Sequence, residues 1–352
     1  YYIENGMGHK WKWLAKVFSF FGACVGLFGI GTFTQVNGIA SAVQSFFDPN
    51  KEDTVSILGT DYSIAIVITA FALAICVGLV VIGGIKRISS VSQVIVPFMA
   101  ILYIVTVLVL IVTNIEKLPG ALATIVEYAF GVKAVAGGVL SSIAISMQKG
   151  IARGIFSNEA GLGSAPIAAA AAKTKEPVRQ GLVTMTGTFI DTIVICTLTG
   201  LSVVITGAWQ VEGLEGVQVT TYAFQNGLPF SNQFCAAVLM ICLVFFAFTT
   251  ILGWDYYGER CLEYLTGKDE KKIKIYRWLY ILAVFIGPYM TVAAVWTIAD
   301  IFNGLMALPN MIALFALSGV VVKETKRFFE VYADQKMANK KSSASIKDAA
   351  EN

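Results

Sequence analysis

Long blocks of apolar residues with almost no charge dominate this chain. Each block is about 20 residues long, the length that a helix needs to cross the hydrocarbon core of a bilayer. Only 14% of the residues are charged, against about 25% in soluble domains. The sequence therefore predicts an all-α polytopic membrane protein. We expect about eight spans, at residues 13–47, 56–83, 92–113, 134–172, 181–208, 231–253, 277–299 and 304–322.

Lys and Arg residues are divided unequally between the two sides of these spans. All but three of the 26 lie on one side: in the N-terminal segment as far as Lys16, in segments 84–90, 149–180 and 254–277, and after the last span. The exceptions are Lys51, Lys117 and Lys133, and Asp300 is expected on their side. Basic residues concentrate in cytoplasmic loops, so we expect both ends of the chain in the cytoplasm.

The remaining segments are expected to lie outside the bilayer core. Segment 118–131 is too short to span and predicts an amphipathic helix on the membrane surface, and 221–230 is a second candidate. The transmembrane domain is expected to cover residues 1–322, and the polar segment 323–352 is expected to be a disordered cytoplasmic tail. The chain begins without Met, so we expect residues to be missing before Tyr1.

The composition argues against several kinds of function. The six cysteines form no CxxC pair, which predicts buried, reduced thiols rather than a zinc site or a disulfide framework. A single histidine, His9, leaves little material for a histidine metal site or Ser–His catalysis. The net charge of +3 is dispersed and indicates no nucleic-acid partner. A membrane enzyme is therefore the function that we rank last.

The fourth span contains a segment that a continuous helix would not tolerate. Residues 157–164 read SNEAGLGS and Pro166 follows, so Gly, Ser, Asn and Pro accumulate there. Non-helical backbone at membrane depth is tolerated where it lines a cavity. The N–H and C=O groups of two half-helices could then hold a carboxylate and a cation. The alternative is a cytoplasmic loop that caps a surface helix.

Other spans carry polar groups that are each compatible with more than one role. Thr249 and Thr250 offer hydroxyl oxygens to Na⁺, or bond back to carbonyls one turn earlier. Trp254, one turn from Thr250, could close a pocket or anchor the helix at the interface. Gln35 could bind a ligand or join helices as an interhelical donor. Asp191 could bind a cation, relay a proton or pair with a basic residue.

The segment GIARGIFSNEAGLGSAP at 150–166 resembles the signature of the alanine or glycine:cation symporter family, also called sodium:alanine symporters. The similarity extends in order to about residue 328 and includes YYIENGMG, GIGTFTQVN and FAFTTILGW. The resemblance implies a LeuT-like bundle of two inverted five-helix repeats with discontinuous first helices. It makes spans 13–47, 134–172 and 231–253 the third, sixth and eighth core helices. The family's helix before the core and its first two core helices are expected to be absent, and a chain truncated there should not transport.

The resemblance also implies a function and a site. We expect Na⁺-driven symport of alanine or glycine into the cell across the plasma membrane. Proton coupling through Asp191 or Glu159, and an uncoupled channel or receptor, are the alternatives. The expected sodium ligands are Thr249 and Thr250, and Asp191 has no role that the resemblance supplies. The expected substrate-binding residues are Phe33, Gln35, Ser157, Asn158, Gly161, Gly163, Ser164 and Trp254.

Overall fold

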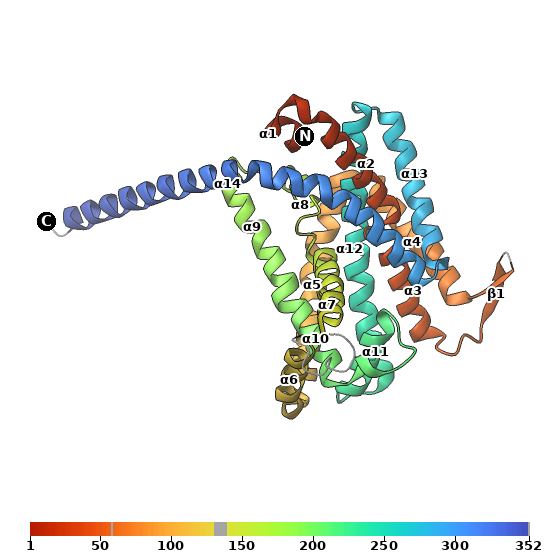
Figure 1. Ribbon diagram of the computed structural model, residues 1–352. Coiled ribbons are helices and arrows are strands. Elements are labelled where there is room, and N and C mark those ends of the chain that lie inside the picture. Colours follow the sequence, from red (N-terminus) through yellow and green to blue (C-terminus); the bar gives the residue numbers. More distant parts are fainter. Residues whose placement is uncertain (58, 130–138, 351–352) are drawn as a thin grey trace.

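The structure is a computed structural model that describes residues 1–57, 59–129 and 139–350. Helices make up most of the described part, and most of them gather into one bundle from which α14 projects (Figure 1). The helices are α1 (Tyr2–Met7), α2 (Lys12–Phe28), α3 (Phe33–Phe47), α4 (Ile64–Val81), α5 (Gly84–Thr113), α6 (Leu118–Ala129), α7 (Val139–Asn158), α8 (Ala165–Ala169), α9 (Pro177–Phe189), α10 (Thr197–Ile205), α11 (Val217–Gly227), α12 (Asn232–Thr266), α13 (Glu270–Ile286) and α14 (Val292–Ala350). A π-helical segment, Ile190–Cys196, joins α9 to α10. The strands β1 (Thr54–Ile57) and β2 (Thr60–Ser63) form an antiparallel hairpin.

The prediction of an all-α membrane protein is confirmed at this level. Within the described residues, six helical stretches are long and apolar enough to cross a membrane. They are His9–Phe47, Ile64–Val81, Gly84–Thr113, Pro177–Ile205, Asn232–Thr266 and Val292–Tyr332. The expected span 134–172 begins outside the described residues. The expected second span starts later than residue 56, because the hairpin occupies the chain as far as Ser63.

The first expected span is interrupted rather than continuous. Helix α2 ends at Phe28 and α3 begins at Phe33. The Thr32 hydroxyl donates to the Gly26 carbonyl, and the Ile30 carbonyl accepts from the Gln35 amide at 2.9 Å. Side chains therefore take the place of backbone donors that the break removes.

The boundary expected between 277–299 and 304–322 is wrong. Helix α13 ends at Ile286, and α14 begins at Val292 and continues past residue 300. Pro288 lacks a backbone N–H, and the backbone of Gly287 lies so close to α3 that an added Cβ would stand 2.3 Å from Val36. Asp300 accordingly lies within a helix and pairs with Arg153 at 2.5 Å, not in a loop.

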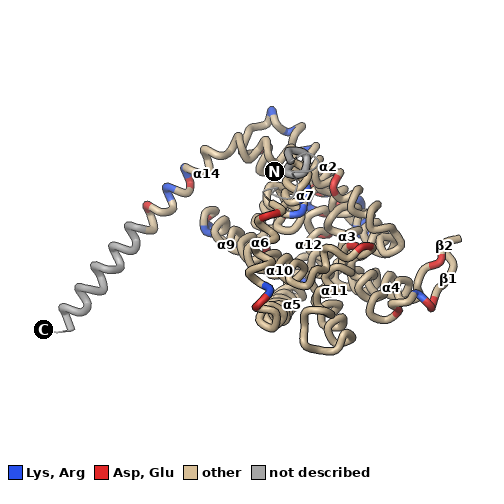
Figure 2. Tube along the Cα trace, turned by 60° about the horizontal axis from the view of Figure 1, so that its bottom comes forward, with Lys and Arg blue, Asp and Glu red and all other residues tan. Residues whose placement is uncertain are grey.

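One further expectation needs correction. The segment after residue 323 is helical as far as Ala350 rather than disordered. It is rich in Ala, Lys and Glu, which favour helix. Figure 2 shows charges on α14 before the stretch drawn in grey and at the hairpin, while long parts of the bundle carry none.

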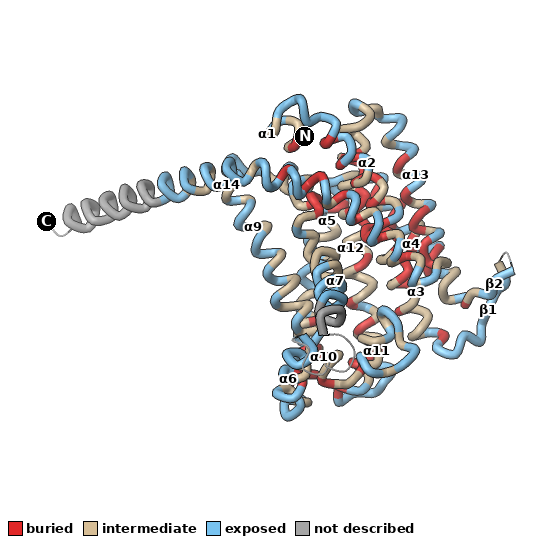
Figure 3. The backbone as a smooth tube through the Cα atoms, in the orientation of Figure 1, coloured by how far each residue is buried: buried red, intermediate tan, exposed pale blue. Residues whose placement is uncertain are grey.

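The buried core lies where α2, α3, α12 and α13 meet (Figure 3). Trp254 and Tyr280 are its largest fully buried side chains. The Tyr280 hydroxyl donates to the Ile251 carbonyl at 2.6 Å, so its polar end is satisfied inside the bundle. By contrast α4 and α5 present exposed side chains such as Ile68 and Val112. Apolar outer faces of this kind suit contact with lipid.

At the end of α3 a buried carboxylate holds the hairpin. Asp48 accepts hydrogen bonds from the Ser63 hydroxyl at 2.5 Å and from the Glu52 backbone N–H at 2.9 Å. The Ser63 bond, and after it the backbone donors, lower the pKa of Asp48 below its usual value. The carboxylate is therefore more stable in the folded protein than in the unfolded chain.

This lowered pKa predicts an acid-sensitive contact. Its stabilisation is complete above the unfolded pKa of about 4 and is lost as the pH falls through the lower folded value. We expect Asp48→Asn to reduce the thermal unfolding midpoint at pH 7, and the difference from wild type to narrow at pH 3. The exposed Asp61 of the same hairpin provides the control Asp61→Asn. An Asp48→Asn deficit that is the same at both pH values would contradict the assignment.

Candidate functional site

The expected interruption of the fourth span is present. Helix α7 ends at Asn158, α8 begins at Ala165, and residues 159–164 between them are not helical. Three of these residues have positive φ: Glu159 (56°), Gly161 (86°) and Gly163 (93°). A Cβ on Gly163 would stand 2.6 Å from the Phe18 ring, so glycine is needed there for space as well as for conformation.

Glu159 ties this broken segment to α12. Its two carboxylate oxygens accept from the Trp254 indole N–H at 2.8 Å and from the Ser164 hydroxyl at 2.5 Å. Trp254 is only 1% exposed, so it belongs to the interior at the break and is not an interfacial anchor. The sequence suggests Glu159 only as an alternative proton carrier. It does not predict the contact with Trp254, because the two residues are 95 positions apart.

The break in the first span lies against the same tryptophan. A Cβ on Gly31 would stand 2.2 Å from the Cβ of Trp254. Glycine at this position therefore lets the α2–α3 connection contact the indole. Asn310 of α14, which the sequence did not indicate as a site residue, also contacts the broken segment. Its amide N–H donates to the Gly161 carbonyl at 2.7 Å, and its amide oxygen accepts from the Tyr2 hydroxyl. Two interrupted helices thus meet around Trp254.

The two threonines expected to bind sodium donate their hydroxyl hydrogens within α12. Thr249 bonds to the carbonyls of Phe245 and Phe246 at 3.0 Å each, and Thr250 bonds to Phe246 at 3.0 Å. This is the back-bonded arrangement that the sequence left open as the alternative. A hydroxyl that donates keeps its lone pairs, so the arrangement is compatible with a cation at the same oxygens.

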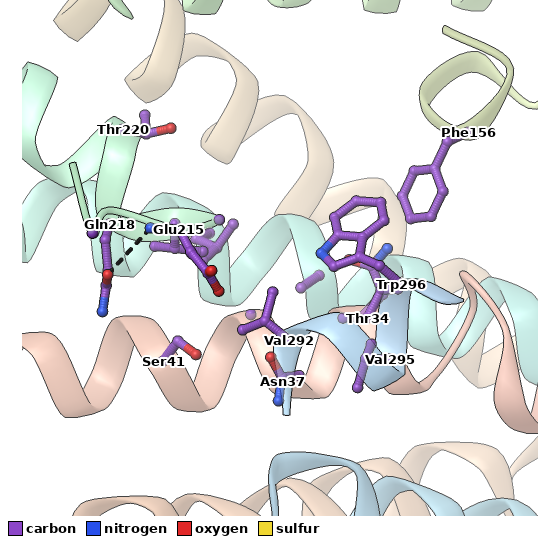
Figure 4. Close-up of a pocket in the computed structure, with 17 residues that line it drawn as sticks. Thr34, Asn37, Ser41, Phe156, Glu215, Gln218, Thr220, Val292, Val295 and Trp296 are labelled. Atoms are coloured by element: carbon purple, nitrogen blue, oxygen red, sulfur yellow. Dashed lines mark hydrogen bonds between the residues drawn. The ribbon is translucent and has the colours of Figure 1, made fainter. Parts of the chain in front are cut away.

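A cavity of about 540 Å³ lies between α3, α7, α12, α14, α11 and the segment before α11 (Figure 4). Gln35 is the one expected substrate-binding residue that lines it. Phe156 and Trp296 stand at one end with ring centroids 4.7 Å apart. Phe33 is instead buried against Ala283 and Val295, so it does not reach the cavity.

The expected site residues therefore separate into groups. Gly161, Gly163 and Ser164 lie in the broken segment beside Trp254. Ser157 and Asn158, at the end of α7, face the π-helical segment instead, where Ser157 donates to Asp191 at 2.8 Å. Within the described ranges, no three or more His, Cys, Asp or Glu side chains come together as a metal-binding group.

A family model for the sodium:alanine symporter family matches residues 1–344. The chain belongs to this family. An uncharacterized transporter of Haemophilus influenzae is 52% identical over 331 residues, which cover 94% of this chain and 68% of the relative. The sodium/alanine symporter AgcS of Methanococcus maripaludis is 46% identical over 336 residues, 94% of this chain and 69% of AgcS. The probable sodium/glutamine symporter GlnT of Bacillus subtilis is 36% identical over 342 residues, 97% of this chain and 65% of GlnT.

These matches confirm the resemblance read from the sequence. The family is one of symporters, and the helices long and apolar enough to span indicate a multi-pass membrane protein. The chain spans about two thirds of the length of the relatives named here. AgcS is named for alanine and GlnT for glutamine, so family membership alone leaves the solute open.

Proposed function

We propose that this chain provides most of a symporter that carries alanine or glycine into the cell across the plasma membrane with Na⁺. The observation that carries the proposal is the non-helical segment 159–164 between α7 and α8, which Glu159 bonds to Trp254 of α12. Non-helical backbone of this kind is tolerated in a membrane where it lines a cavity or is buried in protein. The relative named as a sodium/alanine symporter supports the choice of solute and ion.

We place the solute between the broken segment and α3. Its carboxylate would bind backbone N–H groups of the break, with Gln35 and Trp254 beside it. Ser164 belongs to the same proposed set, whereas Ser157 and Asn158 face the π-helical segment and Phe33 packs against Ala283 and Val295, away from this position.

The same proposal assigns a LeuT-like arrangement and an orientation. Helix α3 would belong to the third core helix, α7 with α8 to the sixth, and α12 to the eighth. The transmembrane domain would end near residue 322. Both ends of the chain would lie in the cytoplasm, because Lys and Arg are concentrated in the segments assigned to that side.

Uptake of radiolabelled alanine into proteoliposomes, with and without an inward Na⁺ gradient, tests this function. The family's N-terminal helices must be present in the protein used. Sodium-driven accumulation that glycine competes for is the expected result. Uptake that follows pH and ignores Na⁺ would favour proton coupling, and equilibration without accumulation would favour a channel.

The sodium assignment predicts the behaviour of a double variant. Thr249→Ala with Thr250→Ala removes two neutral oxygen ligands, so we expect the stimulation of uptake by Na⁺ to disappear. The control is Thr266→Ala, since the Thr266 hydroxyl makes the same kind of bond, to the Leu262 carbonyl at 2.9 Å, at the far end of α12. Replacing both threonines with serine keeps the hydroxyls and should keep the stimulation. Unchanged sodium dependence in the alanine double variant would refute these ligands.

A further inference from the structure

A second cavity, of about 490 Å³, lies at the connection between α12 and α13. This connection is at the same end of the bundle as the N-terminus (Figure 1). The basic side chains that line the cavity are Arg260, Lys268, Lys271, Lys274 and Arg277. The acidic ones are Glu263 and Glu270. None of these residues belongs to the proposed transport site, and the excess of basic groups suits an anion.

The two arginines of this cavity are paired with carboxylates of α12. Arg277 donates to both oxygens of Glu259, from its Nη2 at 2.9 Å, and Arg260 pairs with Glu263. The Arg260 guanidinium also lies 5.3 Å from the centroid of the Tyr256 ring. These contacts fix the arginines in place. The buried Nε–H of Arg260 nevertheless has no acceptor among the described residues, so one donor remains for a ligand.

The two lysines at the start of α13 are not paired in this way. Lys271 and Lys274 are exposed, and neither forms an ion pair within the described ranges. Lys272, which stands between them, does not line the cavity and pairs with Asp269 at 3.4 Å. In the same described ranges Glu270 is the one carboxylate of the lining without an ion pair. Positive charge at the cavity therefore remains uncompensated.

The outer face of α13 continues from these lysines as an apolar stripe. Ile275, Trp278 and Leu282 follow Lys271 and Lys274 at spacings of three or four residues, which places them on one side of the helix. All three are exposed, and Trp278 is 64% exposed. Tryptophan is enriched where a membrane meets water. Basic groups, an interfacial tryptophan and aliphatic side chains thus follow one another along α13.

This order matches the parts of an anionic phospholipid. Phosphate oxygens accept hydrogen bonds from Lys and Arg, and basic clusters beside membrane helices bind acidic headgroups. Acyl chains bury exposed aliphatic side chains. A soluble phosphate would use only the basic end of the face, and Ile275, Trp278 and Leu282 would take no part in binding it. The stripe therefore favours a lipid over a soluble anion.

We propose that the cavity between α12 and α13 binds the phosphate of an anionic phospholipid, whose acyl chains lie along the stripe of Ile275, Trp278 and Leu282. Lys271 and Lys274 balance the charge of the phosphate, and the Arg260 Nε–H is a further donor. The bound lipid connects the end of α12 to the start of α13. This inference goes beyond the proposed function and does not depend on the solute or the coupling ion.

Native mass spectrometry of the purified, delipidated protein, titrated with phosphatidylglycerol, tests the site. We expect Lys271→Gln with Lys274→Gln to weaken the tightest phosphatidylglycerol binding by about tenfold or more, since basic residues near the surface attract anionic lipids. The same variant should lose most of the rise in unfolding temperature that this lipid causes by binding the folded state. Replacing both lysines with arginine keeps the charge and should keep the affinity.

The matched control is Lys10→Gln with Lys272→Gln. It removes the same total charge from exposed positions that do not line the cavity, and it should bind phosphatidylglycerol as wild type does. Phosphatidylcholine carries a phosphate without net negative charge. We expect wild type to bind it more weakly than phosphatidylglycerol, with little difference between wild type and the glutamine double variant.

Three outcomes would overturn the lipid site. The first is wild-type affinity for phosphatidylglycerol in the glutamine double variant at Lys271 and Lys274. The second is an equal loss of affinity in the control pair, which would reduce the effect to net charge. The third is displacement of phosphatidylglycerol by inorganic phosphate at the same concentration, which would make the ligand a soluble anion. Binding is measured without transport, so a protein that takes up no alanine can still confirm the site.

Discussion

Replacing Gly31 with alanine is expected to destabilise the protein by about 1–3 kcal/mol, the usual cost of overpacking a core, and to reduce alanine uptake by an order of magnitude or more. A Cβ at this position would stand 2.2 Å from the Cβ and 2.3 Å from the Cγ of Trp254. Trp254 is fully buried and bonded to Glu159, so it can give way only by moving the broken segment too.

The measurement is thermal unfolding of the purified protein together with uptake into proteoliposomes. Gly253→Ala is the matched control, because Gly253 is next to Trp254 in α12 and its added Cβ would meet nothing within 4 Å. We expect this control to keep or slightly raise the stability, since alanine favours helix. A Gly31→Ala protein as stable and active as the control would show that the α2–α3 connection is not closely packed against the Trp254 side chain.

Removing the Glu159 carboxylate is expected to have an effect of similar size. Glu159→Ala leaves the Trp254 N–H and the Ser164 hydroxyl without their acceptor, and each unsatisfied buried group costs about 1–3 kcal/mol. The broken segment then loses its connection to α12. We expect a lower unfolding midpoint and loss of sodium-driven uptake.

Glu159→Gln separates hydrogen bonding from charge. Its amide oxygen accepts from one of the two donors, so its stability should fall between wild type and Glu159→Ala. Glu212→Ala, at an exposed position, is the control and should behave as wild type. If Glu159→Ala unfolds at the wild-type temperature, the carboxylate does not hold the segment in place.

Much of the architecture could be predicted because its signals are local. Apolar blocks predict spanning helices, and Gly, Pro and Ser between 157 and 166 predict the break that separates α7 from α8. The break at 29–32 was missed because a short run with two glycines in an apolar block is also compatible with a continuous helix. The end of α13 was misplaced because Gly287 and Pro288 lie inside an apolar stretch that hydropathy cannot divide.

The candidate site could be predicted as a set of residues but not as an arrangement. Trp254 was placed one turn from Thr250, yet its burial and its bond to Glu159 depend on the packing of α12 against the broken segment. Phe33 shares a motif with Gln35 but faces another part of the interior, since neighbouring helical positions point in different directions.

The sequence by itself determined that this chain is helical and membrane-spanning, where its fourth span breaks, and to which family it belongs. These properties depend on the hydrophobicity and backbone preferences of residues close together along the chain. Only the tertiary structure decided which polar groups meet: Trp254 with Glu159, and Asp191 with Ser157 rather than with a basic residue. Such pairs join residues 34 to 95 positions apart. Buried polar groups must find partners, but only the packing of the helices brings a particular partner within reach.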